Sequence, residues 1–82
     1  MKLKEAIAQR ITTLMTERNL TVEGLSEATQ LPVKTLQKIL DCGYQRVGQE
    51  KVFIICYAMG IALSDFYKDA IFDPSNIQEA VK

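Results

Sequence analysis

Apolar side chains recur at helical spacing along the whole 82-residue chain. Leu3, Ile7, Ile11 and Leu14, for example, fall on one face of a helix, and no segment shows the alternation of a half-buried strand. Residues that start or end helices divide this pattern into short pieces. They are Asn19, Leu31-Pro32, Gly43, Gly60 and Asp73-Pro74. We therefore expect an all-α fold built from short helices.

The breaks place five helices and a short sixth one. We expect the five over residues 3–18, 22–29, 33–41, 49–59 and 63–68. A last helix is expected to start at Asp73-Pro74 and to carry Ile77, Ala80 and Val81 on one face. Thr21 is a suitable N-cap for the second helix because its hydroxyl can accept a backbone N–H. Residues 43–48, bounded by two glycines, form the longest loop.

Composition excludes several classes of protein. A chain of this length forms one domain, and 48% hydrophobic residues are too many for a disordered protein. Histidine is absent, and Cys42 and Cys56 cannot supply the roughly four ligands of a zinc site, so we expect no metal, cofactor or enzyme activity. The apolar run 52–59 is too short for a membrane span, and the N-terminus does not resemble a signal peptide. We expect a cytoplasmic protein with reduced thiols that uses neither a membrane nor a small-molecule substrate.

The second and third helices have the lengths and the tight turn of a helix-turn-helix. Ser26 is a small residue where the two crossing helices approach, and Leu31 gives the turn an apolar anchor. The outward face of the third helix is short or polar. It consists of Val33, Lys34, Thr35, Gln37, Lys38 and Asp41. Such a face fits the major groove of double-stranded DNA, where Lys and Gln can bond base edges and Val or Thr can contact a thymine methyl.

Four stretches of the sequence carry a wider pattern. They are Leu20-Thr21, Leu25-Ser26-Glu27, Thr35-Leu36-Gln37-Lys38-Ile39 and the run from Ile55 to Tyr67. The pattern resembles the five-helix DNA-binding domain of the phage Cro and lambda-repressor family, also called the XRE family. The resemblance covers about residues 7–67 and implies a helix-turn-helix domain, which we place over residues 1–69. The apolar residues that follow lead us to expect a docking or dimerisation tail over residues 70–82. From the outward face of the third helix we expect base contacts by Val33, Lys34, Thr35, Gln37 and Lys38. We also expect phosphate contacts by Thr21, Gln45 and Arg46, and the resemblance implies the last two, which stand where family members touch the backbone.

Several positions differ from the usual pattern of this family. Gln30 stands where a turn glycine is common, and Val22 stands where a glutamine often contacts phosphate. Met15 and Leu40 stand where the family often pairs an Arg with a Glu. We expect these two side chains to pack together, since apolar packing can equal a buried ion pair in stability.

We expect a sequence-specific DNA-binding transcriptional regulator, a repressor of bacterial or phage type that reads the major groove with residues 33–41 as a homodimer. The net charge is zero, but residues 32–51 carry four cationic and two acidic side chains. A neutral protein gains little affinity from counterion release, which favours two copies on two half-sites. The alternative is a protein-interaction or antirepressor-like module on the same scaffold without DNA binding, which zero charge, Val22 and Gln30 favour.

A set of apolar residues outside the expected core indicates where two copies would meet. The family usually has polar residues at the positions of Ile54 and Tyr57. We expect the dimer interface at Ile54, Tyr57, Ile71, Phe72 and Ile77. Alternatively, the tail folds back over Ile54 and Tyr57 within one chain. Phe53 is expected in the core, and Tyr44 is expected to cover the core beneath its loop.

Overall fold

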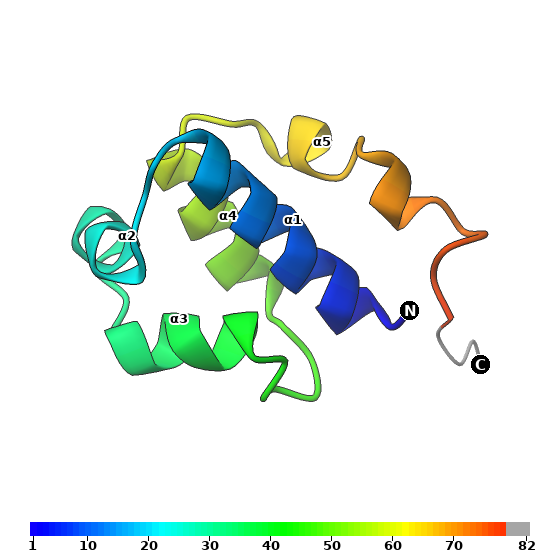
Figure 1. Ribbon diagram of the computed structural model, residues 1–82, viewed down its shortest axis with the longest axis horizontal. Coiled ribbons are helices and arrows are strands. Elements are labelled where there is room, and N and C mark those ends of the chain that lie inside the picture. Colours follow the sequence, from blue (N-terminus) through cyan, green and yellow to red (C-terminus); the bar gives the residue numbers. More distant parts are fainter. Residues whose placement is uncertain (79–82) are drawn as a thin grey trace.

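The structure, a computed structural model, describes residues 1–78, and their regular structure is entirely helical (Figure 1). The elements are α1 (Leu3–Glu17), α2 (Val22–Thr29), α3 (Val33–Leu40), α4 (Gln49–Ala58), α5 (Leu63–Phe66) and the 3-10 turn η1 (Ala70–Phe72). The all-α fold is confirmed. Each of the five expected helices is present, with its ends within two residues of those expected from the sequence.

Three helices end in the same backbone motif. The residues Asn19, Cys42 and Gly60, which follow α1, α3 and α4, have left-handed φ angles of 52°, 59° and 69°. After α3, the Cys42 N–H donates to the Ile39 carbonyl (3.1 Å) and the Gly43 N–H donates to the Lys38 carbonyl (2.8 Å). Gly43 therefore follows the left-handed residue. Its own requirement is space, because a Cβ there would lie 2.7 Å from Cγ of Lys38.

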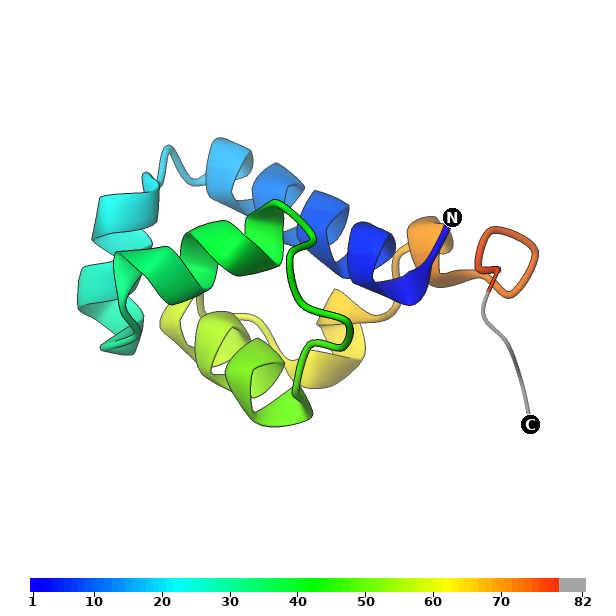
Figure 2. The ribbon, with the colours of Figure 1, turned by 90° about the horizontal axis from the view of Figure 1, so that it is seen from below.

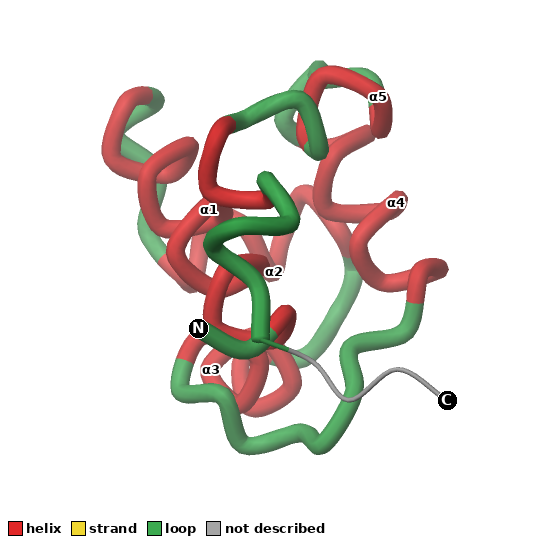
Figure 3. The backbone as a smooth tube through the Cα atoms, turned by 90° about the vertical axis from the view of Figure 1, so that its right-hand side faces the viewer, coloured by secondary structure: helices red, strands yellow, loops and turns green. Residues whose placement is uncertain are grey.

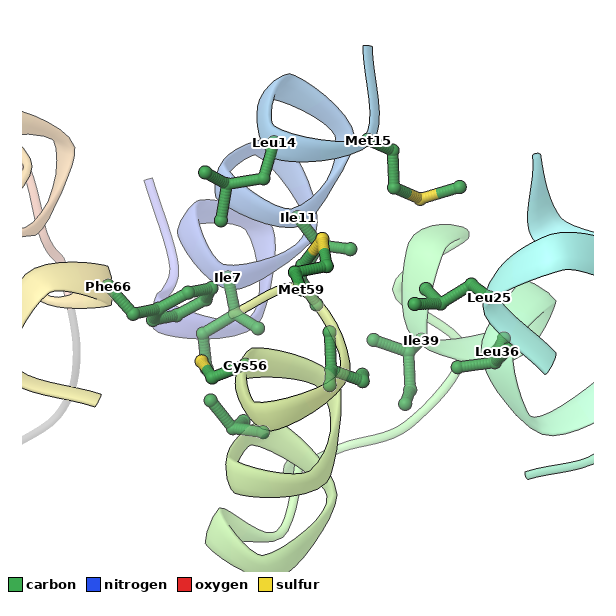
Figure 4. Packing of buried hydrophobic residues seen from close by; sticks show 12 residues of the cluster. Ile7, Ile11, Leu14, Met15, Leu25, Leu36, Ile39, Cys56, Met59 and Phe66 are labelled. Carbon is green, nitrogen blue, oxygen red and sulfur yellow. The ribbon is translucent and has the colours of Figure 1, made fainter. Parts of the chain in front are cut away.

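One hydrophobic core joins the helices (Figure 4). Ile11 of α1, Leu25 of α2, Leu36 of α3, Ile55 of α4 and Phe66 of α5 are each at most 1% exposed. Figure 4 shows Phe66 at one end of this core and Leu25 with Leu36 at the other. α2 packs against α3 and α4, and α1 packs against α3. The core therefore fixes α2 and α3 relative to the rest of the domain.

Met15 and Leu40 both contribute to this core, to different extents. Met15 is buried at 7% exposure, whereas Leu40 is half-buried and packs at the edge of the cluster. Leu40 also lines a shallow pocket with Ala8 and Thr12 of α1. A direct contact between Met15 and Leu40 stays a prediction.

α4 presents two aromatic side chains to solvent, one of which was expected in the core. Phe53 is 55% exposed and Tyr57 is 80% exposed, and their rings stack with centroids 6.3 Å apart. Val52, Ile55 and Cys56 occupy the inner face instead. The expectation for Phe53 was wrong because α4 is apolar on several sides, so that spacing did not show which side faces inward.

The segment after α5 folds back within the chain, but not over Tyr57. The Phe72 ring lies against the rings of Phe66 and Tyr67, with centroid distances of 5.6 and 4.9 Å. η1 packs against α1. Ile71 is half-buried, and the backbone of residues 76–78 bonds to Met1 at the other end of the chain. Phe72 is therefore engaged inside one chain.

The helix expected from Asp73-Pro74 is not formed over the described residues. The Asp73 carboxylate accepts the Ser75 N–H (3.0 Å) and the Ser75 hydroxyl (2.8 Å), which closes a turn two residues long. The same bonds hold the pKa of Asp73 below its ordinary value. An aspartate before a proline can cap a helix or close such a turn, and here it closes the turn. Ile77 is half-buried, and Ala80 and Val81 lie outside the described residues.

Candidate nucleic-acid interface

The turn between α2 and α3 is held by two hydroxyl groups of α2. Ser26 Oγ donates to the Leu31 carbonyl (2.6 Å), and Thr29 Oγ1 accepts the Leu31 N–H (3.2 Å). Gln30, which lies between Thr29 and Leu31 in the chain, has a left-handed backbone with a φ of 64°. Both backbone groups of Leu31 are therefore bonded to α2, which fixes the direction in which α3 leaves the turn. The sequence predicted only the small size of Ser26 and not its hydrogen bond to Leu31.

Thr29 is a residue of the turn that sequence analysis missed. It is buried, and its hydroxyl also donates to the Leu25 carbonyl (2.7 Å). The sequence did contain an indication of this role, because a threonine hydroxyl can accept the backbone N–H of the residue two positions later in a turn.

α3 buries one face and exposes the other (Figure 2). Leu36 and Ile39 are each 1% exposed, whereas Lys34, Gln37 and Lys38 are exposed. Val33 is 39% exposed, and Thr35 is half-buried. Figure 2, drawn from below, shows α3 in front of α1 with its outer side uncovered. The structure thus gathers four of the five expected base-contacting residues on one open face, with Thr35 at its edge.

Two polar groups of this face already have partners. Gln37 Nε2 donates to Asp41 Oδ1 (3.1 Å), one turn further along. Lys38 Nζ lies 4.6 Å from the ring centre of Tyr44, which is a cation–π contact. Nζ of Lys51, a residue of α4, lies 6.0 Å from the centre of the same ring. Tyr44 is half-buried against the core, as expected. The amide oxygen of Gln37 and the ammonium of Lys34 take part in neither contact and remain available on this face.

The expected phosphate-contacting residues lie at the start of α2 and in the loop after α3. Thr21 is exposed, and its Oγ1 accepts the Gly24 N–H (3.0 Å), so it is the N-cap that the sequence predicted. Gln45 and Arg46 are exposed in the loop after α3. Gln45 and Arg46 therefore follow the C-terminal end of α3, whereas Thr21 lies at the start of α2, the end of that helix that does not join α3 (Figure 1).

Arg10 is a second residue that sequence analysis missed, and its role is structural. Its Nε donates to the Phe66 carbonyl (2.9 Å), and its Nη2 donates to the Asp65 carbonyl (3.1 Å). Its Nη1 lies 3.5 Å from the Asp69 carboxylate. A signal was again present, since Arg10 lies three residues after Ile7, on the inward side of α1. Arg10 ties α5 to α1 and does not belong to the α3 face.

The two thiols are structural. Cys56 is 1% exposed, and burial raises the pKa of its thiol, which the nearby Arg10 guanidinium lowers only in part. The thiol therefore stays protonated at neutral pH and is a poor nucleophile. Cys42 is half-buried, with Sγ 3.9 Å from the Lys4 carbonyl. Within residues 1–78, no group of three or more His, Cys, Asp or Glu side chains could hold a metal ion.

Comparisons with known proteins do not assign the chain to a family. No family model matches the chain, and no curated protein or solved structure is significantly similar to it. None of the helices over residues 1–78 is both long and apolar enough to cross a membrane.

Proposed function

We propose that the chain is a sequence-specific DNA-binding transcriptional regulator, a repressor of bacterial or phage type with a lambda-repressor-like fold. One observation carries the proposal. The eight-residue helices α2 and α3 are joined by a turn whose backbone is bonded to Ser26 and Thr29, and this turn leaves the polar side of α3 uncovered. A short helix held out in this way can enter the major groove, which admits one α-helix.

The side chains of α3 then divide by chemistry. Gln37 can pair with adenine through its amide, and Lys34 can donate to guanine. Val33, which is 39% exposed, can meet a thymine methyl, and Thr35 can contact the edge of the same groove. Lys38 reads a base only by leaving the Tyr44 ring, at a cost of about 1 kcal/mol.

In this proposal, the regulator binds DNA as a homodimer. The chain has zero net charge, so one copy gains little affinity from counterion release. Two copies related by a twofold axis would contact half-sites about 34 Å apart. Tyr57 and its stacked neighbour Phe53 are the large apolar side chains that α4 leaves exposed, and half-buried Ile54 lies beside them. These residues are a better candidate interface than Phe72, which already packs inside its own chain.

The second candidate is a protein-interaction module without DNA binding. The exposed Phe53–Tyr57 pair favours it, since exposed aromatic side chains are enriched at protein interfaces. The bond from Gln37 to Asp41 also favours it, because it occupies a base-reading amide and places a carboxylate on the α3 face.

An electrophoretic mobility shift with genomic fragments at two salt concentrations separates the candidates. We compare the wild type with the double variant Lys34→Gln/Gln37→Ala and with the control Lys68→Gln. Lys68 is exposed and follows α5, on the opposite side of the molecule from α3 (Figure 1). A shift by wild type and control that the double variant loses supports DNA reading by α3. No shift by the wild type at the lower salt concentration refutes it and leaves the interaction module.

A further inference from the structure

A basic groove of about 510 Å³ lies between the start of α1 and the loop that joins α3 to α4. Lys2 and Lys4 line it from the side of α1, and Gln45 and Arg46 line it from the loop. None of the residues that line it is acidic. Figure 3 looks at this side of the molecule and shows the N-terminal end of the chain close to the end of α3. Cations from two distant parts of the sequence, Lys2 and Lys4 from one and Arg46 from the other, therefore line the same groove.

None of the three cations of this groove forms an ion pair within residues 1–78. The two ion pairs found over residues 1–78 are Arg10–Asp69 and Arg18–Glu17, both elsewhere. Glu5, the acidic residue nearest in sequence, accepts the Lys2 backbone N–H (2.7 Å) and lines a different pocket. Three cations and no acidic residue in the lining favour an anionic partner at the groove.

The groove is fixed in position relative to α3. Cys42 Sγ contacts the Lys4 carbonyl at 3.9 Å, which joins the start of the loop to the first turn of α1. The Gly43 N–H is bonded to the Lys38 carbonyl, which joins the same loop to the end of α3. A partner bound along α3 would therefore meet Lys2 and Lys4 at a set distance and direction.

We infer that this groove binds phosphate groups of the DNA backbone next to the bases that α3 reads, with Lys2 and Lys4 acting beside Arg46. The inference rests on the proposed function and extends its contact surface to α1, which the sequence did not indicate. Lys2 and Arg46 are exposed, which suits a phosphate chain that passes over the surface better than a small ligand that must be enclosed. Such contacts set the register of the protein on the duplex without reading sequence.

The test measures the salt dependence of binding to a labelled duplex by fluorescence anisotropy, with the full chain. The variants are Lys2→Gln, Lys2→Gln/Lys4→Gln and the control Lys68→Gln. Each lost phosphate contact lowers the slope of log K against log salt by about one unit. We expect a loss of about two units for the double variant, about one for Lys2→Gln, and no change for Lys68→Gln. Circular dichroism verifies that each variant is folded. Because Lys2 is exposed, the single variant Lys2→Gln should fold even if the double variant does not, and it then provides the test.

The outcomes separate this inference from the function on which it rests. If the wild type binds duplexes but Lys2→Gln and the double variant keep its slope, the groove is not a backbone contact and only this inference is overturned. If amide resonances of Lys4 and Arg46 then shift on addition of inorganic phosphate, the groove serves a small anion instead. If the wild type binds no duplex at low salt, the proposed function fails, and the inference fails with it.

Discussion

Replacing Gln30 with glycine should stabilise the protein, because Gln30 is an exposed residue held in the left-handed conformation. Its φ of 64° and ψ of 18° place it in a region where a Cβ crowds the following carbonyl. That crowding costs about 1–2 kcal/mol for an ordinary residue, and glycine avoids it. Glycine in turn makes the unfolded chain more flexible, at a cost of about 0.5–1 kcal/mol.

The Gln30 side chain donates a hydrogen bond from Nε2 to the Glu27 carbonyl (2.9 Å), at an exposed site where water can replace it. We therefore expect a net gain of about 1 kcal/mol for Gln30→Gly. For a domain of this size, that gain raises Tm by about 4–8 °C. Urea and thermal unfolding followed by circular dichroism measure both quantities.

Two matched variants isolate the backbone effect. Gln30→Ala removes the same amide but keeps a Cβ, so its stability should stay within about 0.5 kcal/mol of the wild type. Ala28→Gly, at an exposed helical position of α2, should destabilise by about 1 kcal/mol. If Gln30→Gly also destabilises, as Ala28→Gly does, the turn is not left-handed at this residue and the reasoning is refuted.

Three further predictions concern the α3 face, the core and the interface. Gln37→Ala should cost about 1–3 kcal/mol at one base position and relax specificity there, whereas Arg46→Ala should weaken all duplexes alike and lower the salt slope by about one unit. Titration with selected and scrambled duplexes checks this, and equal losses on every sequence would contradict the two roles. Leu40→Glu should destabilise by about 2–3 kcal/mol because it places a carboxylate at the core edge, and adding Met15→Arg should recover part of that loss. A double-mutant cycle in urea measures the coupling, and zero coupling would show that the two residues do not meet. Tyr57→Asp should turn a wild-type dimer into a folded monomer in sedimentation at micromolar concentration. A wild-type monomer, or an unchanged dimer in the variant, would exclude this face.

The helices and most of their ends could be predicted from the sequence because the signals are local. Thr21 caps α2 through a bond to Gly24 within the same turn, and Asn19 and Gly60 end their helices through their own φ angles. The alternation of buried and exposed residues on α3 follows from one helix alone, since Leu36 and Ile39 lie opposite Lys34 and Gln37. The two short helices α2 and α3, the turn between them and the exposed face of α3 could therefore be predicted without any tertiary contact.

Tertiary packing decided the features whose local signal was ambiguous or absent. α4 is apolar on several sides, so only its contacts with α2 and α5 show that Phe53 faces solvent. Asp73 before a proline could cap a helix or close a turn, and packing of the segment against α1 accompanies the turn.

The basic groove depends on packing alone. Lys2 and Lys4 look like solvated lysines at the start of a helix, and Arg46 looks like a loop arginine in a distant part of the sequence. They line one groove because α1 packs against α3 and the Cys42 thiol contacts the Lys4 carbonyl. Local periodicity specifies which face of a helix is apolar, but the meeting of charges from separate helices is set by how those helices pack.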